Sequence, residues 1–380
     1  MTAKVKANVT SFDSNLYADN AGLELDRKVR SPKKMIESKV FEGDLRGAVR
    51  LLLSEDSYAR QEPSTLAALR LKHPAPSRPL DFPPEPGISL TPVSVTIEEV
   101  VSGLNSFYSG SAGGLDGLRP AHLKELTSVS AGENGQKLLG CLAKLTNFLL
   151  SGQVNPLVCP YLYGASLCAL TKKDGGIRPI AVGSVFRRLT AKAACRAVKE
   201  EMAGYLQPHQ LGFGTRLGCE AAIHATRSYV MDPSNSDSIV LKLDICNAFN
   251  TLERDVLLSE VKEKVPSLYP FLHQVYKPSS KLFFNDDLIY SQVGAQQGDP
   301  LGPLIFSLAI HKIIVELKST LNIWYLDDGT IGGKPEDVLQ DLETLIPRFK
   351  DLGLVVNPSK YYVPAKDLPH VEVSSGGIFV

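Results

Sequence analysis

Two adjacent carboxylates, Asp327 and Asp328, lie between two segments that are typical of β-strands. Apolar residues lead into the pair, and the glycine-rich run 329–333 follows it. Neighbouring side chains in a strand point to opposite faces, but at a hairpin turn both can converge on one site. Gly329 would supply the positive φ that such a turn requires. The pattern therefore predicts a hairpin that presents two carboxylates, the ligands that Mg²⁺ prefers.

A third carboxylate, Asp244, ends the segment 239–245, a short, β-branched and mostly apolar run that predicts a buried strand. Phosphoryl chemistry with two metal ions needs carboxylates from separate segments, because the ions bridge the attacking and the leaving oxygens. After a turn, a helix is predicted with Asn250 as its N-cap and one apolar face (Leu252, Val256, Leu257 and Val261). We expect Asp244, Asp327 and Asp328 to be catalytic and to hold two Mg²⁺ ions, with Mn²⁺ as a substitute.

Five sequence blocks resemble, in the same order, the blocks of reverse transcriptases. They are a fingers block (166–180), motif A (242–250), motif B (296–303), motif C (325–328) and motif D (353–360). The residues in these blocks are most similar to those of the reverse transcriptases of non-LTR (LINE-like) retrotransposons of animals, and the similarity spans about residues 38–365. The resemblance implies an RNA-directed DNA polymerase, which adds dNTPs to a primer 3′-hydroxyl. It also implies an α+β fold, the fingers and palm of a right-hand polymerase, with a small antiparallel sheet backed by helices.

The resemblance assigns dNTP binding to Lys172, Arg178, Phe249 and Gln297. Lys172 and Arg178 flank a Gly175-Gly176 turn, so a hairpin can lay two cations over a triphosphate. Phe249 stands five residues after Asp244 (249 − 244), where an aromatic ring beneath the sugar would exclude a 2′-hydroxyl. The alternatives are a solvated basic turn for the two cations and an ordinary core aromatic for Phe249.

Three further residues have roles that the resemblance implies. Gly298 and Tyr325 would contact template and primer, and the missing side chain of Gly298 would let the backbone come close. Lys360 would be the general acid that protonates pyrophosphate, or else an ordinary surface lysine.

Composition limits the kinds of partner. The 41 basic and 41 acidic residues cancel, so a template channel must be a local basic concentration. One such concentration recurs at helical spacing, at 188, 192, 196 and 199, which predicts a cationic stripe or else a solvated helix face (Arg187, Arg188, Lys192, Arg196 and Lys199). A helix is also predicted over 192–205. The six cysteines show no zinc or disulfide pattern, and no membrane span or secretory signal is present. We expect an intracellular protein that binds an RNA template, a DNA primer and dNTPs and no membrane, and that acts in the nucleus if it is part of an active element.

The chain divides into three segments. Residues 1–73 are polar and then helical over 40–53 and 64–71, residues 74–92 are an extended proline-rich connector, and residues 93–380 hold fingers and palm, with the catalytic blocks at 166–365. Thr96 and Glu99 form a capping-box pattern, and 136–150 is predicted to be helical. Pro347 should kink or end a helix that contains Val338 and Phe349.

Only 20 residues follow Lys360 (380 − 360), which predicts a missing or truncated thumb, or a partner that supplies the grip on primer and template. One alternative to the polymerase is therefore a catalytically silent, nucleic-acid-binding remnant of a retrotransposon polymerase. An RNA-dependent RNA polymerase is a more distant alternative, and Phe249 argues against it.

Overall fold

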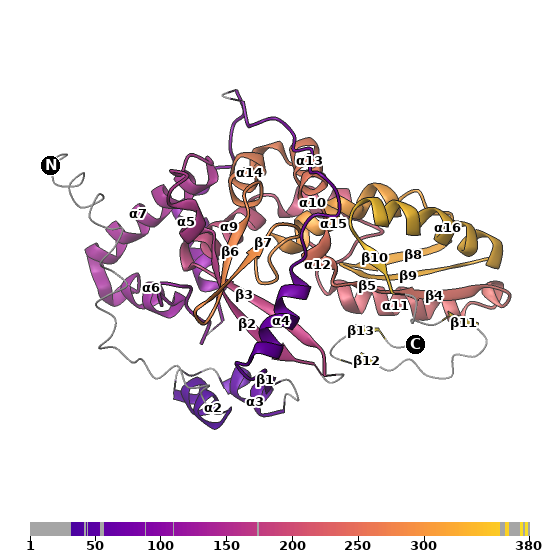
Figure 1. Cartoon of the computed structure of the whole chain (residues 1–380), viewed down its shortest axis with the longest axis horizontal. Coiled ribbons are helices and arrows are strands. Elements are labelled where there is room, and N and C mark those ends of the chain that lie inside the picture. The colour runs from indigo at the N-terminus through magenta and orange to yellow at the C-terminus, as the bar shows by residue number, and fades with distance from the viewer. Residues whose placement is uncertain are drawn as a thin grey trace.

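The computed structural model of the chain is an elongated assembly of helices around several small sheets (Figure 1). It describes residues 32–41, 43, 45–53, 57–87, 89–108, 110–172, 175–357, 362–364, 373–374 and 377–378. None of the helices in these ranges is long and apolar enough to cross a membrane.

Helices form most of the regular structure in the described ranges. The α-helices are α2 (Pro32–Phe41), α3 (Leu45–Leu53), α4 (Pro63–Lys72), α5 (Ile97–Asn105), α6 (Pro120–Leu126), α7 (Gly132–Leu150), α8 (Cys159–Leu162), α9 (Val185–Ala197), α10 (Lys199–Leu206), α11 (Gly218–Met231), α12 (Ala248–Thr251), α13 (Arg254–Lys264), α14 (Tyr269–Tyr276), α15 (Gly302–Ile314) and α16 (Pro335–Asp351). Short 3-10 helices are η2 (Val129–Ala131), η3 (Pro233–Asn235) and η4 (Pro266–Leu268). The predicted α+β class is confirmed, because these helices surround small, mainly antiparallel sheets.

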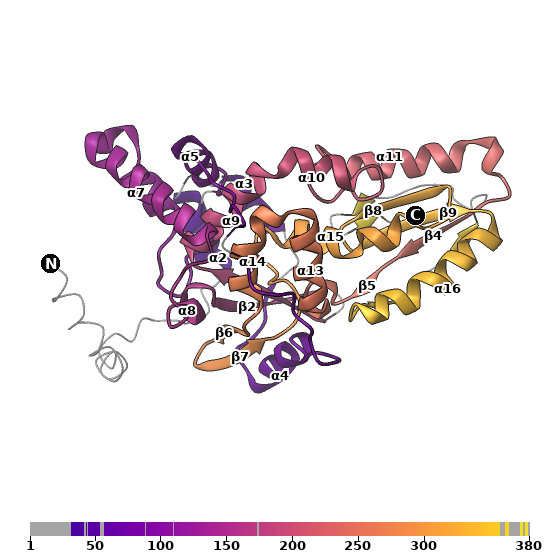
Figure 2. The same cartoon turned by 90° about the horizontal axis from the view of Figure 1, so that it is seen from above.

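A four-stranded antiparallel sheet forms one end of the molecule. Its order is β11 (Tyr362–Pro364), β4 (Ile239–Leu243), β9 (Asp328–Gly333) and β8 (Leu321–Tyr325). Figure 2 shows this sheet between α11 on one side and α16 on the other. Neighbouring side chains in a strand point to opposite faces of the sheet. In β8, Ile323 therefore packs with α11, while the fully buried Trp324 packs edge-on against Phe349 of α16.

A second sheet contains the predicted fingers hairpin. β2 (Ala165–Thr171) and β3 (Ile177–Gly183) pair along their whole length, and β1 (Ser57–Tyr58) and β6 (Ser280–Phe284) also bind β2. β7 (Asp287–Ser291) extends the sheet beyond β6. Leu69 of α4 packs into a small core with Leu167 and Leu282, so the N-terminal helix α4 is part of this unit.

Two pairs of short strands complete the described sheets. β5 (Ile245–Cys246) pairs with β10 (Val355–Val356), and β12 (Val373–Ser374) pairs with β13 (Gly377–Ile378). The β5–β10 pair joins the segment after Asp244 to the segment after α16.

Several predicted helices have different boundaries. The segment 40–53 contains parts of two helices, α2 and α3, with Gly43 at φ +75° between them. The predicted helix 192–205 is also two helices, α9 and α10, separated at Val198. By contrast, α4 and α7 confirm the helices predicted at 64–71 and 136–150, and the Thr96–Glu99 capping box is present at α5.

The predicted N-cap at Asn250 is wrong. Asn250 lies inside the short helix α12, and the N-cap of α13 is Glu253. The break occurs because Leu252 is extended (ψ 127°) and the Glu253 N–H donates to the Leu352 carbonyl at 2.8 Å. Pro347 does not end α16 early, since the helix continues to Asp351 with Leu345 and Phe349 fully buried on either side of the proline.

The proline-rich connector contains neither helix nor strand in its described residues 74–87 and 89–92, but it is fixed to the domain. Its chain runs across α14 and α13 at the top of Figure 1. Arg78 forms a two-pronged contact with Asp255 at 2.6 and 3.1 Å, and the Tyr269 hydroxyl donates to the carbonyls of Pro83 and Pro84. The connector is therefore a strap along the helices rather than a free linker.

Candidate active site

Strand register explains why aspartates that are distant in sequence meet at one end of the four-stranded sheet. Leu243 of β4 pairs with Gly329 of β9, and Tyr325 of β8 pairs with Asp328 of β9. Asp244 directly follows Leu243 and Asp328 directly precedes Gly329, so the aspartates lie at the same end of the sheet. Asp328 and its partner Tyr325 point to the face opposite to the Trp324 core, because neighbouring side chains in a strand alternate.

The turn between β8 and β9 has an unexpected geometry. Leu326, and not Gly329, has the positive φ of the hairpin, at +58°. Gly329 is required for a different reason, because a Cβ atom there would lie 2.6 Å from the Trp324 ring. The predicted hairpin is confirmed, whereas the role predicted for Gly329 is wrong.

Asp244 is held by the segment that follows α16. The Asn357 backbone N–H donates to the Asp244 carbonyl at 2.8 Å, and its side-chain amide donates to Asp244 Oδ2 at 3.1 Å. The β5–β10 pair brings Asn357 to this position, with Val356 opposite Ile245. Asn357 thus fixes one oxygen of the Asp244 carboxylate.

Asp328 has a cationic neighbour in the same sheet. Lys242 Nζ lies 3.7 Å from Asp328 Oδ1, and both side chains are largely shielded from solvent. Within the described ranges no three His, Cys, Asp or Glu side chains form a group ready to hold a metal ion.

The three aspartates line one cavity of about 510 Å³ with predominantly polar walls. The fingers hairpin contributes Lys172 and Arg178, both exposed, from either side of its turn. The fingers hairpin and the end of the four-stranded sheet therefore line the same cavity. The structure brings together the residues predicted for metal and dNTP binding (Asp244, Asp327, Asp328, Lys172, Arg178, Phe249 and Gln297).

Lys72 is a third cation in the cavity wall, and no pattern in the sequence indicated it as a site residue. It ends α4, and its backbone carbonyl accepts a 2.9 Å hydrogen bond from the Asn247 side chain. Asn247 has a left-handed φ of 54° just after the β5 strand, and Asn250 in turn donates to its Oδ1. The N-terminal segment is therefore attached to the loop after Asp244, which places a lysine beside the aspartates.

Phe249 is half-buried at the cavity wall. Its ring stacks on that of Phe306 in α15, with centroids 4.9 Å apart and planes 22° apart. The stack holds the ring in a defined position with one part toward the cavity. The two interpretations offered from the sequence, a core aromatic and a cavity wall, are both compatible with this placement.

Comparison with known proteins agrees with this geometry. The family model described as "Reverse transcriptase (RNA-dependent DNA polymerase)" matches residues 170–366, about half of the chain. The chain belongs to the reverse transcriptase family.

A retrotransposon protein is similar over a larger part of the chain. The "Retrotransposable element SLACS 132 kDa protein" of Trypanosoma brucei gambiense is 28% identical over 288 residues, which cover 73% of this chain and 23% of that protein. The chain thus spans about a quarter of this relative. The predicted likeness to non-LTR reverse transcriptases is confirmed. Among solved structures, an apo telomerase from Candida tropicalis aligns with a TM-score of 0.41 and 12% identity, over 54% of this chain and 51% of that chain.

A buried ion pair holds the segment that corresponds to motif B. Arg187 donates to Asp299 at 2.7 Å, and both side chains are only 2% exposed. Arg187 also donates to the Gln296 side chain and the Tyr163 carbonyl, and the Tyr276 hydroxyl donates to Asp299 at 2.6 Å. Burial tends to lower the pKa of Arg187, but Asp299 together with Tyr276 and Tyr163 outweighs burial, and the pKa is raised. Arg187 is therefore a structural cation and not the template contact predicted for it.

Gly298 is exposed at φ +126°, and a Cβ atom there would lie 2.3 Å from the Ala181 carbonyl. The neighbouring Gln297 carbonyl accepts a 2.8 Å hydrogen bond from the Ala181 N–H of β3. Close approach to the fingers strand therefore explains the glycine without a template. The predicted contact of Gly298 with the template stays a prediction.

The remaining predicted residues differ in their placement. Tyr325 is half-buried at the end of β8 outside the cavity wall, and burial together with Cys219 and Glu220 raises its pKa. Lys360 lies outside the described residues. In the predicted cationic stripe, Arg188 Cζ and Lys192 Nζ lie 5.5 and 4.9 Å from the centroid of the Phe107 ring. These two cations therefore make contacts within the protein.

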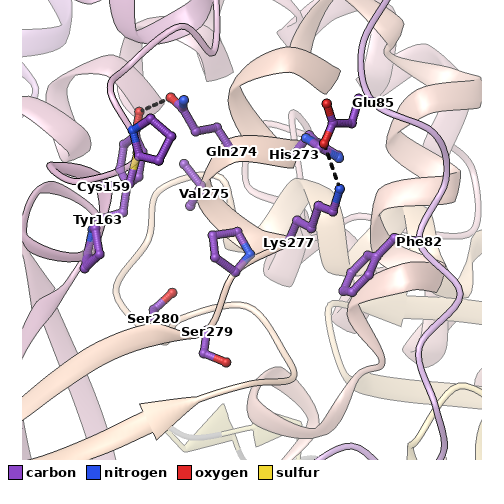
Figure 3. Close-up of a pocket in the computed structure, with 13 residues that line it drawn as sticks. Phe82, Glu85, Cys159, Tyr163, His273, Gln274, Val275, Lys277, Ser279 and Ser280 are labelled. Carbon is purple, nitrogen blue, oxygen red and sulfur yellow. Dashed lines mark hydrogen bonds and ion pairs between the residues drawn. The ribbon is translucent and has the colours of Figure 1, made fainter.

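A second cavity, of about 520 Å³, shares no residue with the first (Figure 3). It lies between the strap, α8, α14 and the start of β6, and its walls are mainly apolar. The dashed contacts in Figure 3 join Tyr163 to Gln274 and Lys277 to Glu85, so these polar side chains bond to one another.

Proposed function

We propose that this chain is an RNA-directed DNA polymerase that adds dNTPs to the 3′-hydroxyl of a primer paired with an RNA template. One observation supports this most strongly: the aspartates Asp244, Asp327 and Asp328 line the same cavity as Lys172 and Arg178. Carboxylates and cations in one cavity match the two parts of the reaction, metal-assisted attack and the release of pyrophosphate.

The three aspartates are the side chains that would hold two Mg²⁺ ions, or Mn²⁺ in their place. These residues fit Mg²⁺ because carboxylate oxygens are the hard donors that this ion prefers, and because the cavity that they line is polar. Lys242 Nζ lies 3.7 Å from Asp328 Oδ1, so a bound ion would compete with this lysine for the carboxylate. When bound, the ions would activate the 3′-hydroxyl and neutralise charge on the leaving oxygens.

The cationic residues act on the triphosphate. Lys172 directly follows β2 and Arg178 lies in β3, on the two sides of the fingers turn, so they bind the β- and γ-phosphates and orient the α-phosphate toward the primer. Lys72 adds a third positive charge from α4. Lys360 is proposed as the general acid for pyrophosphate on resemblance alone.

The other predicted residues act on the sugar and the base pair. Phe249 is proposed to contact the sugar, with its ring held by Phe306, so that a 2′-hydroxyl has no space. Gln297 is proposed to contact the incoming nucleotide, and Gly298 and Tyr325 to contact template and primer. These assignments depend on the motif resemblance and on the shared cavity wall of Phe249 and Gln297.

The test is primer extension by the purified chain with Mg²⁺. We expect a DNA primer on an RNA template to be extended with dNTPs and not with NTPs, and Asp327→Asn to abolish extension. Primer–template binding is measured in parallel by fluorescence anisotropy. Binding without extension under any metal or template would support the silent nucleic-acid-binding domain instead, and extension only with NTPs would support an RNA polymerase and overturn the role of Phe249.

A further inference from the structure

The turn that carries the catalytic carboxylates contains a residue in an unfavourable backbone conformation. Leu326 directly precedes Asp327 and has φ +58°, a region that residues with a side chain seldom occupy. Such a conformation persists only where the surroundings hold it in place. The contacts of Leu326 therefore decide where Asp327 lies.

One side chain satisfies both polar backbone groups of Leu326. The Gln210 side chain is fully buried, its Oε1 accepts from the Leu326 N–H at 2.8 Å, and its Nε2 donates to the Leu326 carbonyl at 3.1 Å. A backbone N–H can only donate and a carbonyl can only accept, so the orientation of the amide is unique. Gln210 Oε1 also accepts from the Gly212 N–H at 3.0 Å, which fixes the side chain from its own loop.

The loop that carries Gln210 is itself bound to the hairpin. The Leu211 N–H donates to the Trp324 carbonyl at 2.8 Å, and the Trp324 N–H donates to the His209 carbonyl at 2.7 Å. Gly212 completes the contact, because a Cβ atom there would lie 2.4 Å from Leu326 Cδ2 and 2.7 Å from the Leu326 nitrogen. Only glycine leaves space for Leu326 in this position.

We propose that Gln210 is a positioning residue for catalysis, which holds the Leu326 backbone so that Asp327 and Asp328 face the cavity. This inference rests on the proposed polymerase function. A carboxylate that shifts by about 1 Å can lower the rate by roughly 10²-fold, so a clamp on the residue before Asp327 affects chemistry more than substrate binding.

The first test measures the clamp without any need for activity. Hydrogen exchange of the Leu326 amide is followed by mass spectrometry in the wild type and in Gln210→Met, which keeps length and removes both hydrogen bonds. Gln207→Met is the matched control, since Gln207 is exposed on the same loop and bonds to Thr215. We expect faster exchange at 326 in Gln210→Met alone. Equal exchange in all three proteins would overturn the clamp.

The second test measures the catalytic role. In Gln210→Glu the introduced carboxylate can accept from the Leu326 N–H but cannot donate to its carbonyl until it is protonated. Burial raises the pKa of such a group, so the activity of this variant relative to the wild type should rise as the pH falls toward 6. In both Gln210 variants the maximal rate should fall about tenfold or more, while the KM for dNTP stays within about threefold of the wild-type value. The activity of Gln210→Met relative to the wild type should not rise as the pH falls.

The possible failures are distinguishable. Unchanged maximal rates in Gln210→Glu and Gln210→Met would refute the positioning role while primer extension by the wild type still supports the polymerase. If the wild type itself extends no primer, the polymerase and the catalytic role of Gln210 both fail, and the exchange measurement still decides whether Gln210 holds the turn.

Discussion

The buried ion pair below motif B gives a quantitative prediction. Arg187 and Asp299 are each 2% exposed, and Arg187 also bonds to Tyr163 and Gln296. Arg187→Met leaves the Asp299 carboxylate buried without its counter-ion, which costs about 3–5 kcal/mol of the free energy of unfolding. Adding Asp299→Asn removes the uncompensated charge, so the double variant should be more stable than Arg187→Met alone.

The matched control is an exposed pair in the same molecule. Arg348 and Glu316 form an ion pair whose side chains are 35% and 59% exposed. Solvent screens this pair, so Arg348→Met should cost about 1 kcal/mol or less. The assay is urea unfolding followed by circular dichroism at 25 °C, with the free energy taken from midpoint and slope. The reasoning is refuted if Arg187→Met costs no more than Arg348→Met, or if Asp299→Asn destabilises Arg187→Met further.

Three further predictions concern binding, selectivity and pH. Lys72→Ala should raise the KM for dNTP about 3- to 10-fold through the lost charge contact, whereas the exposed lysine variant Lys137→Ala should leave it unchanged; equal values for both would remove Lys72 from the site. Phe249→Val should increase incorporation of ribonucleotides relative to deoxynucleotides by about tenfold or more, measured with single nucleotides, and an unchanged ratio would make Phe249 a core residue only. Burial and the neighbouring His209 lower the pKa of His311 from 6.5 to about 4, so its contribution to stability is present above pH 6.5 and is lost as the pH falls toward 4. His311→Phe should reduce that loss in urea titrations between pH 7 and pH 4, and identical pH dependence would contradict the assignment.

Local patterns predicted the elements that carry the aspartates. The apolar run that Asp244 ends and the paired aspartates between two strand-like segments specify strands with carboxylates at their ends, and antiparallel register brings them together. The fingers hairpin was predictable for the same reason, because two glycines separate two apolar strands. Family resemblance supplied the roles that these patterns alone left open.

Contacts between distant segments were not predictable from the sequence. Leu326 adopts its positive φ because Gln210, 116 residues earlier, bonds to both of its backbone groups. Arg187 stands in a basic cluster and is nevertheless buried, because Asp299 is 112 residues away in sequence and adjacent in space. Lys72 reaches the cavity because α4 packs on the fingers sheet and its last carbonyl accepts from Asn247. Nothing in the local sequence of these residues signals a distant partner.

The most direct test of the polymerase assignment is the rate of single-nucleotide addition by Asp244→Asn at saturating primer and RNA template. This variant keeps the side-chain volume and the contact geometry with Asn357, but removes the negative charge from a proposed metal ligand. The control is Asp287→Asn, a half-exposed carboxylate on β7 outside the cavity. We expect Asp244→Asn to lower the rate by about 10³-fold, equivalent to about 4 kcal/mol of transition-state stabilisation, with primer–template affinity and the Asp287→Asn rate unchanged. A rate within a few-fold of the wild type would contradict the proposed chemistry of this cavity.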